Sequence, residues 1–255
     1  MENDILISHA LDLARRCRED YVVTSTPFCD MAQRSLLSGS LKGCGARFEF
    51  FGGYGDAERT VCVFLPDYID DMESFFADSP DECPIEVIRC TSKKGSPPLS
   101  HRDYLGSLMA LGIKREKIGD IIVVEGGADI VILKETEKFL LSEYKSAGRV
   151  NFDTVALPVN KITAPKIKTE SVRGSVASAR LDNLISEAFS LSREAAAQAV
   201  EAGLVFVNEA RATKPDAKIS EGAKIVLRGR GKVIFREVAG QTRRGRLSVI
   251  FEKYV

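Results

Sequence analysis

Residues 178–208 read SARLDNLISEAFSLSREAAAQAVEAGLVFVN, and this stretch contains two helical patterns followed directly by a strand pattern. Apolar side chains recur from Leu181 to Ala188 at i, i+3, i+4 and i+7, which predicts an amphipathic helix with Ser178 as its N-cap. Ser192 can cap a second helix in the same way. The stretch therefore predicts two short helices that lead into a sheet.

The residues that follow supply that sheet. KIVLRG, KVIFREV and RLSVIFEKY alternate apolar and polar side chains and are separated by glycines, which is typical of strands. We therefore expect an α+β domain over residues 177–255, in which two helices pack on a small β-sheet.

Charge is divided unevenly along the chain, although 36 Lys and Arg against 36 Asp and Glu give a net charge of zero. Residues 1–165 hold 19 basic and 26 acidic side chains, a net charge of −7, whereas residues 166–255 hold 17 and 10, a net charge of +7. A basic C-terminal module indicates a polyanionic partner, and nucleic acid is the first candidate.

Two arginines of this module lie at the starts of its predicted helices. We expect Arg180 and Arg193 to form one phosphate cradle, because free backbone N–H groups and the positive end of the helix dipole favour anions there. Basic residues of the predicted strands and loops extend the same positive surface. The residues expected to contact RNA are Arg180, Asn183, Ser192, Arg193, Gln198, Lys214, Lys218, Arg228, Arg230 and Lys232.

The first 80 residues predict a small α/β region. Helices are expected at about 5–17 and 28–37, followed by strands in ARFEFFGGYG and RTVCVFLP. GGYGD between these strands is interpreted as a tight turn, since glycine supplies the positive φ that turns require. Between Arg59 and Arg89 acidic residues accumulate without Lys or Arg, and we interpret this segment as an exposed acidic connector.

Residues 81–158 follow the order β-α-β-β-α-β, the ferredoxin-like pattern that RNA-recognition modules share. The first helix is expected to start at a capping box, Ser100 with Asp103, and to end at Gly112; the second is expected at about 135–147. The strands contain no aromatic pair on which such modules stack bases, so the pattern predicts the fold and not the binding mode. The apolar face of the first helix is expected to consist of Leu105, Leu108, Met109 and Leu111.

Residues 159–176 are interpreted as a basic linker between the ferredoxin-like domain and the C-terminal domain. The segment has mostly basic charges, contains a proline and shows no apolar period. A basic linker beside a basic domain can follow the phosphates of a nucleic acid.

Several stretches resemble known families. ARLDNLI, LSREAAAQAVEAGLVFVN and EGAKIVLRGRGK are similar to the S-four RNA-binding domain, which is built from two helices on a small sheet. FFGGYGDAERTVCVFLP, LSHRDYLGSLMALGIKREKIGDI and TRRGRLSVIFEKY resemble the YlmH-type RNA-binding proteins of bacteria nearly from end to end. The sequence departs from that family at PFCDMAQRSLL, where the family usually has Phe-Leu-Asp-Pro, so the start of the second helix is in doubt.

This resemblance implies a factor without catalytic activity or cofactor. It would bind rRNA and peptidyl-tRNA on the large ribosomal subunit, in ribosome-associated quality control of stalled translation. Secondary contacts are expected from Arg102, Lys114, Arg115 and Lys117. The six cysteines form no Cys-x-x-Cys pair and no secretory or membrane segment is visible, so we expect a cytoplasmic protein without a metal or a membrane contact. We also expect a monomer without a small-molecule substrate.

Other classes of protein fit parts of the sequence. ARLD at 179–182 imitates the catalytic motif of RNA pseudouridine synthases, but Asp182 falls in an amphipathic helix and is expected to support local hydrogen bonds. His101-Arg102-Asp103 imitates the kinase catalytic loop, without the Asn and the Asp-Phe-Gly that a kinase needs. A protein adaptor that uses the acidic front half is the third alternative.

Overall fold

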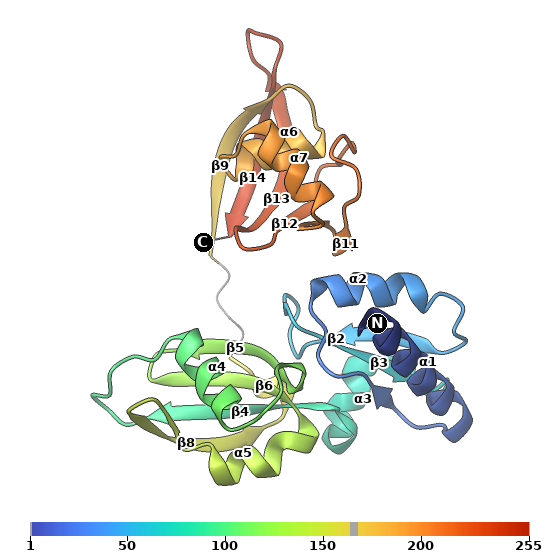
Figure 1. Cartoon of the computed structure of the whole chain (residues 1–255), viewed down its shortest axis with the longest axis vertical. Helices are drawn as coiled ribbons and strands as arrows, with labels where there is room; N and C mark the ends of the chain where they lie inside the picture. The colour runs from blue at the N-terminus through green and yellow to red at the C-terminus, as the bar shows by residue number, and fades with distance from the viewer. Residues whose placement is uncertain (1, 164–167, 255) are drawn as a thin grey trace. The chain divides into compact units, whose positions relative to one another are not determined.

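The computed structural model describes residues 2–163 and 168–254. The chain divides into two compact units, Met1–Pro165 and Lys166–Val255 (Figure 1). Each unit has its own sheets and its own hydrophobic core. The mixture of helices and largely antiparallel sheets confirms the expected α+β class.

The front part of the first unit is a three-stranded sheet with helices. Its sheet has the order β1-β3-β2, and every residue of β3 is buried. The helix α2 begins three residues later than expected, because Asp30 caps it by accepting hydrogen bonds from the backbone N–H groups of Ala32 and Gln33. The elements are α1 (Glu2–Asp20), β1 (Thr24–Ser25), α2 (Met31–Ser40), β2 (Arg47–Phe51) and β3 (Val61–Leu65).

The expectation of an exposed acidic connector between Arg59 and Arg89 is wrong. This segment contains β3 and the helix α3 (Met72–Asp78), whose Met72 and Phe76 are buried against the sheet. Apolar residues four positions apart place one face of α3 in the core, while its acidic residues stay in water. The turn expected in GGYGD is present, with a φ of +89° at Gly53.

The second part of the first unit has the ferredoxin-like order that the sequence predicted. Its sheet has the order β5-β6-β4-β8-β7 with antiparallel neighbours, and α4 and α5 cover one face through Tyr104, Leu108, Leu140 and Tyr144. The elements are β4 (Ile85–Ser92), α4 (His101–Ala110), β5 (Ile118–Val124), β6 (Gly127–Leu133), α5 (Glu137–Glu143), β7 (Ser146–Ala147) and β8 (Val150–Leu157).

The helix α4 shows the expected ends but a different inner face. Ser100 and Asp103 form the capping box, and Gly112 follows the helix with a φ of +81°. Tyr104 and Leu108 are the buried residues, whereas Met109 and Leu111 are exposed, so the expected apolar face was wrong at these two positions. The helix α5 is also shorter than expected, because residues 146–147 and 150–151 pair as strands.

The opposite face of this sheet is covered by the front part of the unit. Ile85, Val131 and Leu133 pack with Phe28 of the β1–α2 loop and with Val61 of β3. A Cβ on residue 119 would lie 2.7 Å from the Phe28 ring, so the close contact requires Gly119. The larger sheet of the first unit is therefore covered by α4 and α5 on one face and partly by the front part on the other.

Hydrogen bonds between residues 50–59 and residues 112–120 join the front part of the first unit to its ferredoxin-like part. Asp120 on β5 accepts hydrogen bonds from the Tyr54 hydroxyl at 2.7 Å and from the backbone N–H groups of Glu58 and Arg59 at 2.7 and 3.1 Å. The Arg59 guanidinium in turn donates to the carbonyls of Ile118 and Phe28, each at 3.0 Å. FFGGYGDAER and GIKREKIGD thus meet at one internal contact.

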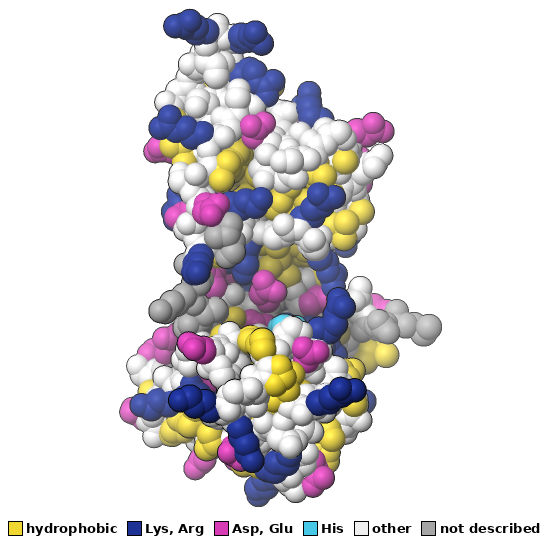
Figure 2. All heavy atoms as spheres, turned by 90° about the vertical axis from the view of Figure 1, so that its left-hand side faces the viewer, with side chains coloured by type: hydrophobic (Ala, Val, Ile, Leu, Met, Phe, Trp, Pro, Cys, Tyr) yellow, Lys and Arg dark blue, Asp and Glu magenta, His cyan; other side chains and the backbone are white. Residues whose placement is uncertain are grey.

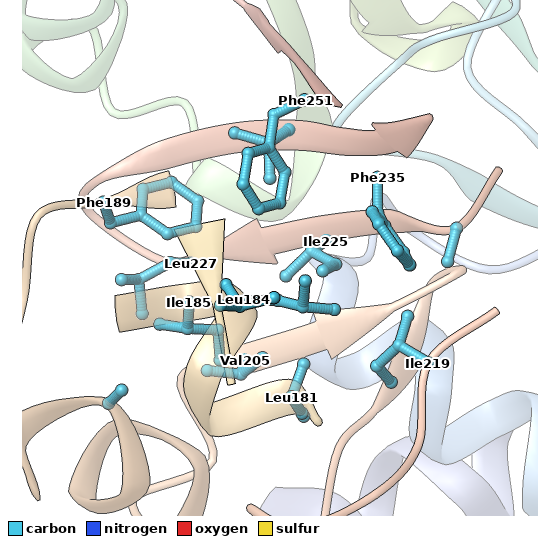
Figure 3. Packing of buried hydrophobic residues seen from close by; sticks show 14 of the residues in the cluster. Leu181, Leu184, Ile185, Phe189, Val205, Ile219, Ile225, Leu227, Phe235 and Phe251 are labelled. Atoms are coloured by element: carbon cyan, nitrogen blue, oxygen red, sulfur yellow. The ribbon is translucent and has the colours of Figure 1, made fainter. Parts of the chain in front are cut away.

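The second unit is a six-stranded sheet of order β11-β10-β12-β13-β14-β9, with α6 and α7 packed on one face. Figure 3 shows Leu181, Leu184 and Ile185 of α6 directed at Ile225, Phe235 and Phe251 of the sheet, all buried. The elements are β9 (Thr169–Val176), α6 (Leu181–Ala188), α7 (Arg193–Glu201), β10 (Val205–Val207), β11 (Ala210–Arg211), β12 (Lys224–Leu227), β13 (Gly231–Gln241) and β14 (Leu247–Tyr254).

The linker expected at 159–176 is wrong for its second half. Residues 169–176 form β9, which pairs with β14 from Thr169↔Tyr254 to Val176↔Leu247. The only fully buried side chain of β9 is Val176, so this edge strand lacks the apolar alternation by which strands are recognised. Residues 159–161 form a 3₁₀ turn, and residues 164–167 lie outside the described part of the chain.

Candidate nucleic-acid interface

The starts of α6 and α7 lie side by side in the second unit and are built differently. Arg180 is the N-cap residue of α6, so the expectation of Ser178 as the cap is wrong. Ser178 instead accepts hydrogen bonds from the Asn183 amide at its backbone and side-chain oxygens, at 3.3 and 2.9 Å. Ser192 caps α7 by accepting a hydrogen bond from the backbone N–H of Ala195 at 3.1 Å.

The two arginines meet at Asp182. Arg180 donates from Nε to Oδ1 at 3.2 Å and from its terminal nitrogen to Oδ2 at 3.0 Å, and Arg193 donates to Oδ2 at 3.3 Å. The Asp182 side chain is 7% exposed, whereas those of Arg180 and Arg193 are 43% and 62% exposed. The expected convergence of the two arginines is therefore present, and a buried carboxylate holds it together.

The electrostatics of this cluster favour an anion. Burial alone would raise the pKa of Asp182, but hydrogen bonds from Arg180 and Arg193 outweigh it and hold the pKa below its usual value. Two guanidinium groups on one ionised carboxylate leave one unit of positive charge. Each guanidinium has five N–H donors, so donors that Asp182 does not use can bind a phosphate from the solvent side.

The backbone of the α6 start is not open to phosphate, contrary to expectation. The N–H groups of Leu181 and Asp182 donate to the carbonyls of Ala217 and Pro215, at 2.9 and 2.8 Å. The loop that supplies these carbonyls carries Lys214 and Lys218, both exposed, and the backbone of Lys218 forms a bridge with Arg180. At this helix the positive charge comes from side chains and not from free N–H groups.

The remaining predicted contacts are scattered. Asn183 is buried with its amide bonded to Ser178, so its assignment as an RNA contact is wrong. Gln198 is exposed on α7. Arg228 and Arg230 lie at the β12–β13 turn, where the N–H of Arg228 donates to Leu204, just after the carboxyl end of α7.

Lysine 232 lies on the sheet itself. The ammonium groups of Lys232 and Lys224 lie 5.2 and 5.9 Å from the ring centroid of Tyr254, close enough for cation–π attraction. The structure thus groups Arg180, Arg193, Lys214 and Lys218 around one helix start. Lys232, Arg228 and Arg230 belong to other places in the unit.

Among the secondary contacts expected in the first unit, Arg115 has an internal role. Its guanidinium donates to the carbonyls of Ile118 and Gly119, and burial, with a smaller effect of nearby Arg59, lowers its pKa to about 10. Lys117 pairs with Glu135 at 3.1 Å and Lys114 with Glu116 at 4.0 Å, while Arg102 is exposed at the start of α4. Arg115 is therefore committed to the fold and is a poor candidate for RNA contact.

A family model matches part of each unit. The family model of a putative RNA-binding domain in YlmH matches residues 80–161, and that of the S4 domain matches residues 179–225. A protein of Bacillus subtilis (strain 168), named ribosome-associated protein quality control protein P2, is 29% identical over 247 residues, which cover 97% of this chain and 93% of that protein. The chain therefore contains a YlmH-type putative RNA-binding domain and an S4 domain. A solved structure, cell division protein ylmH from Streptococcus pneumoniae, is 22% identical with a TM-score of 0.48 and covers 64% of this chain and 95% of that one.

The sheet of the YlmH-type domain at 80–161 is covered to different extents on its two faces. One face of its sheet lies under α4 and α5, and the other lies under β3, α3 and Phe28. Beyond that cover, Arg89 and Asp129 pair on the sheet and bind Thr163. Further along β8, Asp153 and Val155 are exposed, so this face of the sheet is only partly covered.

A cavity of about 560 Å³ lies within the first unit. Its walls are mainly the glycine-rich loop after β2, the helix α3 and the 3₁₀ turn at Val159–Lys161, and none of the residues predicted to contact RNA lines it. Among the described residues, Thr60 Oγ1 and Glu86 Oε2 are buried oxygens without a hydrogen-bond partner, and both residues line the cavity.

Residues 2–163 and 168–254 contain no group of three or more His, Cys, Asp and Glu side chains placed to hold a metal ion. Within the same residues, no helix has the length and apolar character needed to cross a membrane. All six cysteines are free thiols.

Proposed function

We propose that this protein binds the RNA of the large ribosomal subunit through its S4-containing unit and acts, in the cytoplasm, on subunits that hold peptidyl-tRNA after translation has stalled. The name of the Bacillus subtilis relative and the alignment over nearly both chains support the ribosomal setting. The +7 charge of residues 166–255 supports RNA as the partner of this unit.

The observation that carries the proposal is the convergence of Arg180 and Arg193 on Asp182. Asp182 is 7% exposed, so it orients both guanidinium groups without competing strongly for the solvent side. Fixed arginines bind phosphate with less loss of side-chain entropy than free ones, because their geometry is already set. Lys214 and Lys218 add positive charge at the same helix start.

The same cluster supports a binding role and not a catalytic one. A pseudouridine synthase needs its aspartate free to reach a base, whereas Asp182 accepts hydrogen bonds from two arginines and from the backbone N–H of Asn183 at 2.9 Å. We therefore propose that the protein catalyses no reaction and that it acts as a monomer.

The test is a salt titration against purified large subunits that carry peptidyl-tRNA. Arg180 and Arg193 cannot simply be removed, because a nearly buried Asp182 would lose its partners and the fold would weaken. The variant is therefore Arg180→Ala, Arg193→Ala, Asp182→Asn, compared with Asp182→Asn alone. Two lost phosphate contacts should reduce the slope of log affinity against log salt by about 1.4 to 1.8.

Arg15→Ala, Arg16→Ala provides a matched control. These two arginines are 62% and 67% exposed and pair with Asp12 and Asp20 in the first unit. The control should bind with the wild-type slope. A cradle variant that keeps its native circular dichroism and also keeps the slope of Asp182→Asn would contradict the proposal.

A nuclease test separates this function from that of a protein adaptor. Co-sedimentation of the wild-type chain with large subunits should disappear when the exposed rRNA is digested. Retention on digested particles would favour a protein partner for the acidic first unit.

A further inference from the structure

The hairpin formed by β13 and β14 extends beyond the part of the sheet that covers the core. β12 pairs with residues 231–234 of β13, and Phe235 lies in the core, whereas Gly240 and Gln241 have ladder partners on β14 alone among the described strands. Two register shifts, at Phe235/Glu237 and Val238/Gly240, precede this outer part. We call residues 239–248 the arm.

The tip of the arm is a well-defined turn with the sequence TRRGR at 242–246. The N–H of Thr242 donates to the Arg246 carbonyl at 2.8 Å, and the N–H of Gly245 donates to the Thr242 carbonyl at 2.9 Å. The Thr242 hydroxyl accepts a further bond from the N–H of Arg246 at 3.1 Å, and Gly245 has a φ of +74°. The turn therefore fixes the direction of the two residues between its ends.

Three arginines lie at this tip and do different things. Arg246 turns back to β9, where its guanidinium donates to the Ser175 hydroxyl at 3.1 Å and also to the Ser175 carbonyl. Arg243 and Arg244 are exposed, and within the described residues neither makes a hydrogen bond or an ion pair with another side chain. The sequence contains no Asp or Glu from 238 to 251 that could neutralise them.

A short stretch of chain connects the arm's anchor on β9 to the arginine cradle. Ser175, which holds Arg246, precedes Arg180 by five residues, and five residues of extended chain span at most about 18 Å. Figure 2 shows basic side chains at the end of the unit from which the hairpin projects, at the top of the view. One RNA segment can therefore contact the arm and the cradle together.

We propose that the arm is a second RNA-binding element, in which Arg243 and Arg244 bind backbone phosphates of the RNA held by Arg180 and Arg193. This inference rests on the proposed function and extends it to residues outside the matched S4 segment at 179–225. The chemistry of the tip fits phosphate, because guanidinium groups bind phosphate oxygens in pairs. The tip carries no apolar side chain that would anchor a protein interface or enter a membrane.

The contact is expected to be independent of base sequence. Arginines on a turn can reach phosphates from outside a helix, whereas base edges in double-stranded RNA are largely inaccessible to side chains. The arm should therefore raise affinity for all RNA stems by a similar factor. The contribution of the arm to RNA affinity should fall as the salt concentration rises, since each phosphate contact releases counterions.

The test uses the full chain and a fluorescently labelled RNA stem–loop, titrated by anisotropy at several salt concentrations. The variants are Arg243→Ala, Arg244→Ala and the charge-preserving Arg243→Lys, Arg244→Lys, with Arg15→Ala, Arg16→Ala as the control outside the unit. In the alanine variant, the slope of log affinity against log salt should fall by about 1.4 to 1.8. Lowering the salt from 1 M to 0.1 M should therefore raise the affinity of this variant roughly 30-fold less than that of the wild type. The lysine variant should keep the wild-type slope.

The outcomes distinguish the arm from the proposed function. If the alanine variant binds with the wild-type slope while the cradle variant loses slope, the arm inference is wrong and the proposed function stands. If the wild-type chain binds neither the stem–loop nor large subunits, both are wrong. The substitutions are at exposed turn positions, so the melting temperature by circular dichroism should stay at the wild-type value.

Discussion

Each unit buries one aspartate beside arginine, and the two sites differ in how the arginine donors are used. In the first unit Asp129 is fully buried, and Arg89 donates to both of its carboxylate oxygens at 2.7 Å. The same guanidinium donates to the Lys161 carbonyl and to the Thr163 hydroxyl, at 3.0 and 2.9 Å. One cation and one anion cancel, and the arginine's donors are largely satisfied inside the unit.

In the second unit two arginines share one carboxylate. Asp182 receives three guanidinium hydrogen bonds, and Arg180 and Arg193 stay about half exposed. The charge does not cancel, and donors remain toward the solvent. An arginine beside a buried carboxylate is therefore structural when the pair is closed, and available for binding when arginines outnumber the carboxylate.

The largest effect should come from breaking the closed pair. Arg89→Ala leaves the fully buried Asp129 without its cation, and a buried pair broken in this way costs about 3 to 5 kcal/mol. Urea-dependent hydrogen exchange of peptides from residues 2–163 measures this loss separately from the second unit. Arg89→Ala combined with Asp129→Asn should recover part of the stability, and a single variant within about 1 kcal/mol of wild type would refute the assignment.

A smaller loss of stability is expected for Arg115→Ala. Its guanidinium satisfies the carbonyls of Ile118 and Gly119, and hydrogen bonds from charged groups contribute about 1.5 to 3 kcal/mol. The expected outcome is lower hydrogen-exchange protection of the first unit with an unchanged salt slope for RNA. Lys114→Ala, Lys117→Ala is the matched control, because exposed ion pairs contribute about 0 to 1 kcal/mol. Equal losses of hydrogen-exchange protection in both variants would show that Arg115 stabilises the first unit no more than the two lysines do.

Lowering the pH should destabilise both units, because each contains a buried aspartate that is bound by arginine. Hydrogen bonds from arginine outweigh burial and lower the pKa of Asp129 and Asp182 in the folded protein. The stability they contribute is fully present above the unfolded pKa of about 3.9 and is lost as the pH falls through the lower folded pKa. In Asp182→Asn, the free energy of unfolding of the second unit should therefore fall less steeply as the pH is lowered, and that of the first unit should be unchanged. The readout is hydrogen exchange or urea unfolding between about pH 5 and 2, and a changed pH dependence in the first unit would contradict this.

The smallest effects separate two neighbouring residues at the start of α7. Ser192→Ala removes the N-cap and should cost about 1 kcal/mol without any change in the salt slope. Arg193→Ala should leave stability within about 1 kcal/mol, because Arg180 still pairs with Asp182, and should lower the slope by about 0.7 to 0.9. If Ser192→Ala lowers the slope as well, Ser192 contacts RNA directly.

Local patterns predicted much of this architecture. The α+β class, the ferredoxin-like order of 81–158, the capping box at Ser100 and the two helices after 178 were all confirmed, because caps and apolar periods depend on near neighbours. The convergence of Arg180 and Arg193 was also predicted. Their common carboxylate, Asp182, was expected only to support local hydrogen bonds, and its bond to Arg193 spans eleven residues.

The errors have a common physical origin in contacts between distant parts of the chain. β9 exists because β14, more than seventy residues later, pairs with it, although its own side chains are mostly exposed. Asn183 and Arg115 look like surface residues until their partners are known. Arg243 and Arg244 were overlooked because a pair of arginines beside a glycine has no distinctive period, and their projection depends on the pairing of β13 with β14.

The position of β14 also fixes when the second unit can form during synthesis. β14 joins β9 to the other strands of the sheet, yet it is the last of the six to leave the ribosome. Until Leu247–Tyr254 emerges from the exit tunnel, β9 lacks its neighbour and the arm lacks its second strand. Since domains fold as units during translation, a growing chain reaches its RNA-binding form only after β14 has been made. The order of strands therefore delays RNA binding until synthesis of this unit is finished.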